Sequence, residues 1–320
     1  MTLSYGPRLF CLLTVVAGLV YTLVRVALFC AARFLLRRLQ SARPRLRERV
    51  LYVLQIVPAL LAIFIAGALC LPEYLRHEPT RNAERVGWIT LLLVATVCIW
   101  FGSVFLRALR ITLRTLSFSR TCRIIGRIVD LGGDLPFLAL AEPLPPLGLV
   151  GFFRPFVIVS ENLLEPGNLE SGSLQVALDH ERAHARQFDN WKLLSLCFLP
   201  RLPGDSWRRH WQAAADWAAD DDAGCGDPAR RLLLADALVR TARLAKPSPS
   251  HVICAALTGA ESDLSVRIVR LLCPGQHSPS DLNSLLPGLA GVALLTVCAV
   301  ACASPWVYTA CEQILHLGGL

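Results

Sequence analysis

The sequence predicts an integral membrane protein, mainly α-helical, with an α+β domain between the third and the fourth of four membrane-spanning helices. Of its 320 residues, 54% are apolar and only 18% are charged, unlike a typical soluble domain. Four apolar segments are long enough to cross a bilayer, which takes about 20 residues each. The stretch between the third and fourth segments is long enough for one hydrophobic core.

The four spans are expected at 9–30, 51–71, 86–106 and 285–307, so that 1–107 holds three helices and 308–320 forms a short external tail. The first span is not a cleavable signal peptide, because no basic stretch precedes it and arginines follow it. Arg25 lies in its last turns, from which its side chain can reach the membrane surface.

Arginines crowd the first connection and the stretch after the third span, whereas glutamates balance those of the second connection. Basic residues accumulate on the cytoplasmic side of membrane proteins. We therefore expect a multi-pass protein of the bacterial inner membrane, with 108–284 cytoplasmic and both termini external. The net charge of +8 then reflects topology, so the bilayer is a partner and direct nucleic-acid binding is not expected. None of the twelve cysteines forms a C-x-x-C pair in 108–284, so no disulfide framework or cysteine zinc site is indicated.

The segment 108–284 begins with short apolar runs typical of strands and continues with helices. The runs are "CRIIGRIVD", "PFLALAE" and a strand at Phe156–Ser160, which is a candidate edge for pairing with a peptide. A helix is expected to start at Leu174, capped by Ser171 or Ser173, and to continue through Leu194. Further helices are expected at 207–223, 230–244 and 263–272.

The stretch "LDHERAHARQFDN", residues 178–190, carries the pattern H-E-x-x-H. On a helix His180 and His184 project from one face, and Glu181 lies beside them. This spacing provides two nitrogen ligands for Zn²⁺ and a carboxylate near the bound water. The alternative is an ordinary amphipathic helix whose polar stripe contains these residues. Arg182 and Arg186 already make the helix polar, so solubility does not require the histidines.

A carboxylate on a second helix is the expected third ligand. "DWAAD" offers Asp216 and Asp220, one turn apart and facing the same way. We assign Asp216 to the metal, and Asp220 to accept the Nδ1–H of a ligating histidine, which fixes its tautomer. Asp221 and Asp222 are expected at a solvated helix end.

Several stretches together resemble the membrane-embedded zinc metallopeptidases of β-lactam-resistance signalling, the BlaR/MecR type of antirepressor. They are "GFFRPFVIVSENLL", "ALDHERAHARQFDNW", "DWAADDDA" and, more weakly, "VRIVRLL". The resemblance implies a small gluzincin-like zinc endopeptidase domain in signal transduction. It implies zinc held by His180, His184 and Asp216, Glu181 as the catalytic base, and a supporting pair, Asp189 and Asn190. The implied substrate is a cytoplasmic transcriptional repressor, the protein itself, or both.

Two departures from that family keep alternatives open. The metal-binding glutamate of the family is Asp216 here, one methylene shorter, which also fits a catalytically inactive membrane signalling scaffold. No extracellular sensor domain follows the last span, so we expect a separate sensor protein as a partner. A membrane quality-control zinc peptidase shares H-E-x-x-H and E-x-x-A-D on a four-helix frame. The pair Asp189 and Asn190 favours the signalling family.

Overall fold

The computed structural model describes residues 2–77, 84–132, 135–141, 145–244, 254–256, 261–273 and 304–317. The predicted fourth span, 285–307, lies outside these residues except for its last four, which begin a helix at Ser304. The described chain is mostly helical, with two small sheets.

Three helices of the chain are long and apolar enough to cross a membrane. They are α1 (Tyr5–Leu39), α4 (Trp88–Ile125) and a continuous helix built from α2 (Pro44–Phe64), η1 (Ile65–Cys70) and α3 (Leu71–His77). Large apolar side chains on their outer faces are exposed, for example Leu23, Ile63 and Ile99. Such faces suit the hydrocarbon of a bilayer.

The helices extend well beyond the predicted spans, most of all α4. We expected the third span to end at 106, but α4 continues to Ile125. At 1.5 Å per residue its 38 residues are about 57 Å long, roughly twice the thickness of a bilayer core. The second half of α4 therefore carries the chain from the apolar segment to the five-stranded sheet, where Arg123 Nη2 donates to the carbonyl of Arg154 at 2.6 Å.

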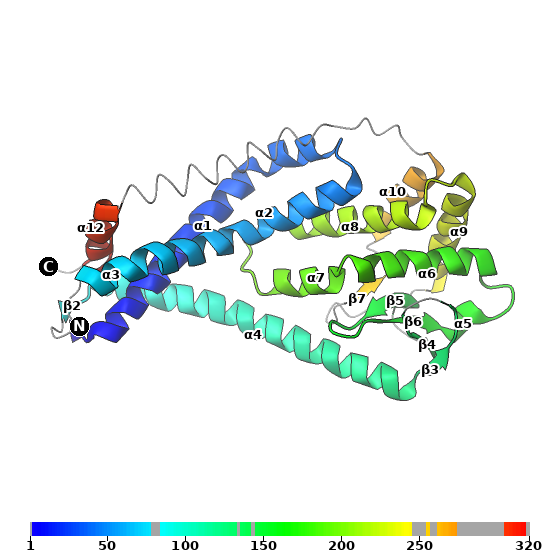
Figure 1. The fold of residues 1–320 in the computed structure, drawn as a ribbon, viewed down its shortest axis with the longest axis horizontal. Coiled ribbons are helices and arrows are strands. Elements are labelled where there is room, and N and C mark those ends of the chain that lie inside the picture. Colours follow the sequence, from blue (N-terminus) through cyan, green and yellow to red (C-terminus); the bar gives the residue numbers. More distant parts are fainter. Residues whose placement is uncertain are drawn as a thin grey trace.

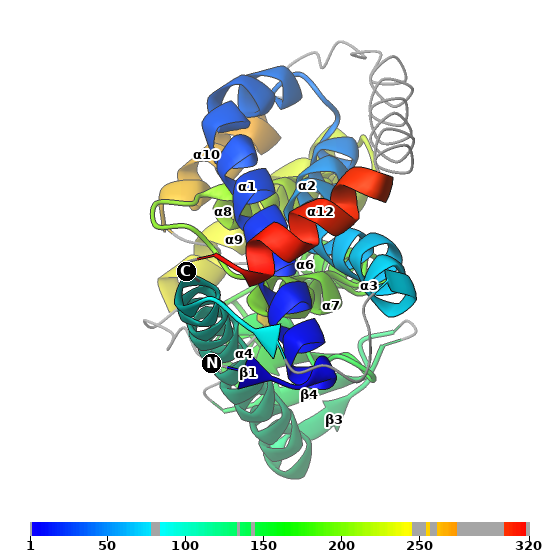
Figure 2. The same cartoon turned by 90° about the vertical axis from the view of Figure 1, so that its left-hand side faces the viewer.

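Both ends of the described chain lie at the end of the molecule that is remote from the five-stranded sheet (Figure 1). There β1 (Thr2–Leu3) pairs antiparallel with β2 (Glu84–Arg85). Helix α12 (Ser304–Leu315) contacts α1, η1 and α3, and it lies across α1 (Figure 2). The hydroxyl of Thr90 and the amide of Gly87 donate to carbonyls of α12.

The larger sheet has the order β3-β4-β6-β5-β7. Its strands are β3 (Arg127–Val129), β4 (Phe137–Leu140), β5 (Leu147–Val150), β6 (Phe156–Ser160) and β7 (Cys254–Ala256). Strand β6 has the predicted bounds, but the expectation that it forms an edge is wrong. It pairs parallel with β4 and antiparallel with β5, so its main-chain groups are already used on both sides. The predicted strand in "CRIIGRIVD" starts only at Arg127, because α4 includes 122–125.

Six helices accompany this sheet in the described part of the chain. They are α5 (Glu161–Leu164), α6 (Ser171–Arg186), α7 (Asp189–Cys197), α8 (Trp207–Gly224), α9 (Pro228–Leu244) and α10 (Glu261–Leu272). The last three agree with the predicted helices within a few residues. The helix expected to continue through Leu194 is instead two helices, because the chain breaks at Phe188, whose φ is 56°.

Two apolar clusters hold the domain together and attach it to the long helices. The first packs α6 and α9 on the sheet, with Leu147, Val157, Leu178 and Leu238 at its centre. The second joins α2 to α7 and α8 through buried residues such as Leu51, Leu194 and Trp211. Helices α6 and α8 therefore meet between the sheet on one side and the long helices on the other (Figure 1).

Candidate metal centre

The H-E-x-x-H residues lie on the buried face of α6, where this helix packs against α8. His180 and Glu181 are fully buried, and His184 is 2% exposed. Asp216 reaches the same point from α8, and its side chain is 17% exposed. This burial is incompatible with the alternative of a solvated polar stripe, because such residues would face water.

Three side chains converge there with the spacing that a metal ion requires. His180 Nε2 lies 3.1 Å from His184 Nε2, which lies 3.6 Å from Asp216 Oδ1. One ligand atom from each of the three residues lies within 4.8 Å of the others. Ligand atoms of a tetrahedral metal with bonds of about 2.0–2.1 Å are roughly 3.3 Å apart. His180, His184 and Asp216 thus form a group that could hold a metal ion.

A buried ion pair between Asp220 and Arg267 contacts His180. The Nδ1 of His180 lies 3.0 Å from Asp220 Oδ1. Arg267 of α10 donates to both carboxylate oxygens of Asp220, from Nε at 2.9 Å and from Nη2 at 2.6 Å. Burial raises the pKa of Asp220, but Arg267 and His180 outweigh it and hold this pKa well below its usual range. Asp220 therefore faces His180 as a carboxylate.

His184 is backed by a chain of contacts that reaches a long apolar helix. Its Nδ1 lies 2.7 Å from Asp189 Oδ2. Lys192 Nζ donates to Asp189 Oδ1 at 3.0 Å and to Glu48 Oε1 of α2 at 2.9 Å. Trp211 Nε1 also donates to this glutamate oxygen at 3.0 Å. Polar contacts thus link α2 to one of the candidate metal ligands.

Asn190 contributes to the site through the backbone of the sheet. Its Nδ2 donates to the carbonyls of Leu149 and Gly151, at 3.1 Å each. This clamp fixes the start of α7 against β5, next to the point where Asp189 meets His184. The predicted pair therefore makes two separate contacts: Asp189 contacts a histidine, and Asn190 contacts the sheet.

The carboxylates of Asp189 and Asp220, which we call the outer carboxylates, determine which atoms of the two imidazoles face each other. Because both Nδ1 atoms face carboxylates, the facing Nε2 atoms carry the lone pairs, and these repel unless a proton or a cation lies between them. Burial lowers the pKa of His184, but Asp189 outweighs it and raises this pKa to about 9. Burial lowers the pKa of His180 to about 4. One proton thus satisfies the metal-free pair, and a metal ion would take its place.

Glu181 is a buried carboxylate that lies near the backbone of Leu149, but its oxygens accept no hydrogen bond of ordinary geometry from the described residues. Burial raises its pKa to about 7, against the opposing charge of His184. Burial likewise raises the pKa of Asp216 to about 6, against Arg267. Native proteins rarely leave buried polar atoms unsatisfied. An orphaned carboxylate beside three candidate ligands fits a centre that binds a cation and its water.

Three residues of this centre were not predicted from the sequence: Glu48, Lys192 and Arg267. Arg267 had a detectable signal, because helical spacing places it on the same buried stripe of α10 as Leu264 and Leu271. A charged residue in an apolar stripe predicts a buried partner. Glu48 and Lys192 gave no such signal, since 144 positions separate them.

No protein-family model matches this sequence, and a search of curated proteins likewise finds no match. The candidate metal centre is therefore defined by its own geometry and chemistry.

Proposed function

We propose that this protein is a membrane-embedded, zinc-dependent endopeptidase of signal transduction that cleaves a cytoplasmic transcriptional repressor, itself, or both. One observation carries the proposal: two imidazole Nε2 atoms lie 3.1 Å apart beside Asp216 and the unsatisfied carboxylate of Glu181. Two histidines and one carboxylate, with a fourth position open, are the ligand set of many catalytic zinc sites. This set favours zinc over magnesium or calcium, which prefer oxygen ligands alone.

Each residue of the centre has a role in this proposal. His180, His184 and Asp216 hold the ion, while Asp220 and Asp189 keep the two imidazoles in the ligating tautomer. When bound, zinc would lower the pKa of a coordinated water to about 7 and would polarise the scissile carbonyl. Glu181 accepts the proton of the attacking water and passes it to the leaving amine. Burial raises the pKa of Glu181 to about 7 in the metal-free protein, and a bound cation would lower this pKa and favour the carboxylate form, which accepts a proton.

The short side chain of Asp216 is the feature that also suits an inactive scaffold. Its Oδ1 nevertheless lies 3.6 Å from His184 Nε2, so the packing of α6 on α8 compensates for the missing methylene. This distance supports the enzyme over the scaffold, and the experiment below separates them.

A peptide substrate would add to the sheet at a free edge, and β6 is not one. Within the described residues the outer strands are β3 and β7. Of these two outer strands, β7 packs against α6 and α7, the helices that carry the histidines and Asp189. We propose that the substrate strand lies along this side of the sheet, where main-chain pairing would present a peptide bond to the centre.

The membrane topology follows from the arginine distribution and is part of the proposal. Both ends of the described chain lie remote from the metal centre (Figure 1). If the basic flank of α4 is cytoplasmic, the centre faces the cytoplasm, where a repressor would meet it.

The test is the variant Glu181→Gln in the full-length protein. It should bind zinc at the wild-type stoichiometry of about one per chain and lose proteolysis by 10²- to 10⁴-fold, because only the general base is removed. The readouts are zinc content of the purified protein and, in cells, self-cleavage or cleavage of a co-expressed candidate repressor. Glu165→Gln, an exposed site, is the matched control and should behave as wild type.

Either of two results would contradict the proposal. Wild-type signalling in Glu181→Gln would remove the enzyme and leave the scaffold. Absence of zinc from the wild-type protein, purified without chelator, would remove the metal centre itself.

A further inference from the structure

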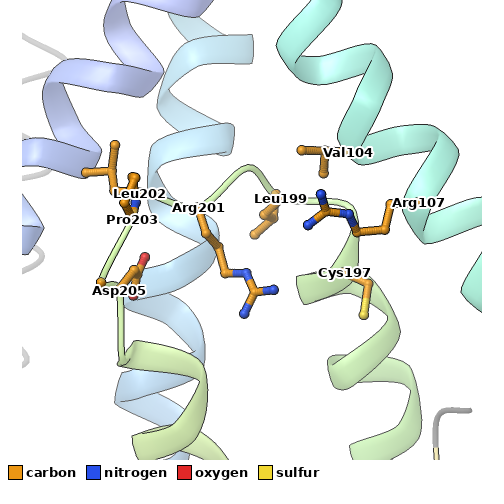
Figure 3. Close-up of a pocket in the computed structure, with 9 residues that line it drawn as sticks. Val104, Arg107, Cys197, Leu199, Arg201, Leu202, Pro203 and Asp205 are labelled. Atoms are coloured by element: carbon orange, nitrogen blue, oxygen red, sulfur yellow. The ribbon is translucent and has the colours of Figure 1, made fainter. Parts of the chain in front are cut away.

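A pocket of about 360 Å³ lies between α4 and the segment that joins α7 to α8, and none of the metal-centre residues lines it. Val104 and Arg107 form its wall on α4, Cys197 closes it at the end of α7, and Leu199 and 201–205 complete it (Figure 3). Its volume is within the range of small-molecule sites, about 300–1,000 Å³.

The pocket carries an excess of positive charge. In Figure 3 the guanidinium group of Arg107 extends from α4 towards Leu199, and that of Arg201 extends from the 199–205 segment into the space between α7 and α8. Within the described part of the chain, no hydrogen bond or salt bridge engages either group. Two arginines of one pocket that lie close enough to repel each other favour an anion between them.

Asp205 lines the same pocket and attracts Arg201, but both of its carboxylate oxygens already have other partners. Its Oδ2 accepts from Arg25 Nη2 at 2.5 Å, and both side chains are 2% exposed. Its Oδ1 accepts from the backbone N–H of Trp207 at 3.0 Å. Arg25, which lies in the predicted first span, therefore pairs with Asp205 and offsets its charge. The charges of Arg107 and Arg201 remain.

The pocket lies where the apolar part of α4 ends. Arg107 is the first charged residue of this helix, after the uncharged stretch 88–106. The two residues directly before it, Phe105 and Leu106, are exposed. A charged pocket that directly follows an exposed apolar surface matches a phospholipid, whose charged headgroup adjoins acyl chains.

We propose that this pocket binds the phosphate group of an anionic phospholipid, with Arg107 and Arg201 donating to its oxygens. The planar guanidinium matches phosphate with two parallel hydrogen bonds, and the acyl chains would lie along the exposed face of α4. Such a lipid would hold the 199–205 segment, and with it the start of α8, at the membrane surface. This inference is independent of the proposed peptidase activity.

The test is lipid binding to the full-length protein in detergent, measured by native mass spectrometry. The probes are dihexanoyl-phosphatidylglycerol, dihexanoyl-phosphatidylcholine and inorganic phosphate. The wild type should bind the anionic lipid about tenfold more tightly than the zwitterionic one. The double variant Arg107→Gln/Arg201→Gln should lose about tenfold or more of that affinity, because two charge-assisted contacts are removed. Arg110→Gln/Arg209→Gln, which removes two exposed arginines outside the pocket, should change it less than twofold.

Each remaining outcome decides against the proposal. Equal binding of the two lipids by the wild type overturns it, and so does an equal loss in both double variants. Inorganic phosphate binding as tightly as the anionic lipid would assign the pocket to a free phosphate instead. If the glutamine variant does not fold, Arg107→Lys/Arg201→Lys keeps the charge and should still weaken lipid binding several-fold, since an ammonium cannot form the paired contact. Wild-type affinity in this lysine variant would contradict the arginine assignment.

Discussion

The two outer carboxylates, Asp189 and Asp220, allow a sharp test of the metal centre. Each accepts the Nδ1–H of one histidine, but the two carboxylates have different basic partners. Asp189 Oδ2 lies 2.7 Å from His184 Nδ1, and its partner Lys192 also binds Glu48. Asp220 Oδ1 lies 3.0 Å from His180 Nδ1, and its two oxygens hold the buried Arg267. Removing either carboxylate should affect zinc equally, but only one removal should greatly destabilise the fold.

Asp189→Ala should lower zinc affinity by 10- to 100-fold, about 1.4–2.7 kcal/mol, because His184 loses the acceptor that fixes its tautomer. The metal-free protein should lose about 1–2 kcal/mol, because the contact of Asp189 with His184 is removed while Lys192 keeps Glu48. Asp220→Ala should lower zinc affinity by a similar factor. It should also destabilise the metal-free protein by about 3–5 kcal/mol, because Arg267 loses the carboxylate with which it forms a buried ion pair.

Competition with a chromophoric zinc chelator measures the affinity, and thermal unfolding in chelator measures the stability of the metal-free protein. Asp130→Ala, which removes an exposed aspartate, is the control and should leave both unchanged. If Asp189→Ala binds zinc within twofold of wild type, the orienting role of Asp189 is refuted. If Asp220→Ala is as stable as Asp189→Ala, the reasoning about Arg267 is wrong.

Three further predictions concern the pH dependence, the third ligand and the topology. Zinc must displace the proton of His184, whose pKa in the metal-free centre is about 9, so zinc affinity should fall up to tenfold per unit as pH decreases from 8 to 6. Chelator competition across this range checks it, and a flat profile would contradict the shared-proton arrangement. Asp216→Ala should strongly reduce the zinc content of the purified protein, whereas Asp216→Glu should retain it; full zinc in Asp216→Ala would reassign the third ligand. Reporter domains inserted in the exposed 165–168 turn and fused after Leu320 should report opposite sides of the membrane, and the same side for both would overturn the arginine argument.

The sequence predicted local features of this fold better than the pairing of distant ones. The bounds of β6 and α8 were predictable, because a short continuous apolar run and an isolated amphipathic stretch are local signals. The central place of β6 was not, since it depends on β4 lying parallel to it and on β5 lying antiparallel. The length of α4 was underestimated for a related reason. Hydropathy marks where a helix leaves the bilayer, not where it ends, and arginines after Leu106 are good helix formers.

The candidate site shows the same division between local and distant information. Helical spacing places His180, Glu181 and His184 on one face, and the sequence alone predicts this. The pairing of Asp220 with Arg267 spans 47 residues and depends on where α10 packs. The sequence marks Arg267 only as a charged residue in an apolar stripe, which predicts a buried partner. The structure is needed to identify that partner as Asp220.

The turn at Phe188 explains why the sequence predicts one helix where the protein has two, α6 and α7. In one uninterrupted helix, Asp189 would be five residues after His184, about 140° away around the axis, and could not meet its Nδ1. Phe188 instead adopts φ 56° and ψ 36°, a left-handed conformation that costs a non-glycine residue about 1–2 kcal/mol. Its ring is 68% exposed, so burial of the ring does not offset this cost. The contacts of Asp189 with His184 and Lys192 form only because the chain turns here, and they are the compensating interactions. The apolar periodicity that predicted a continuous helix is therefore overridden where the metal centre needs its second carboxylate.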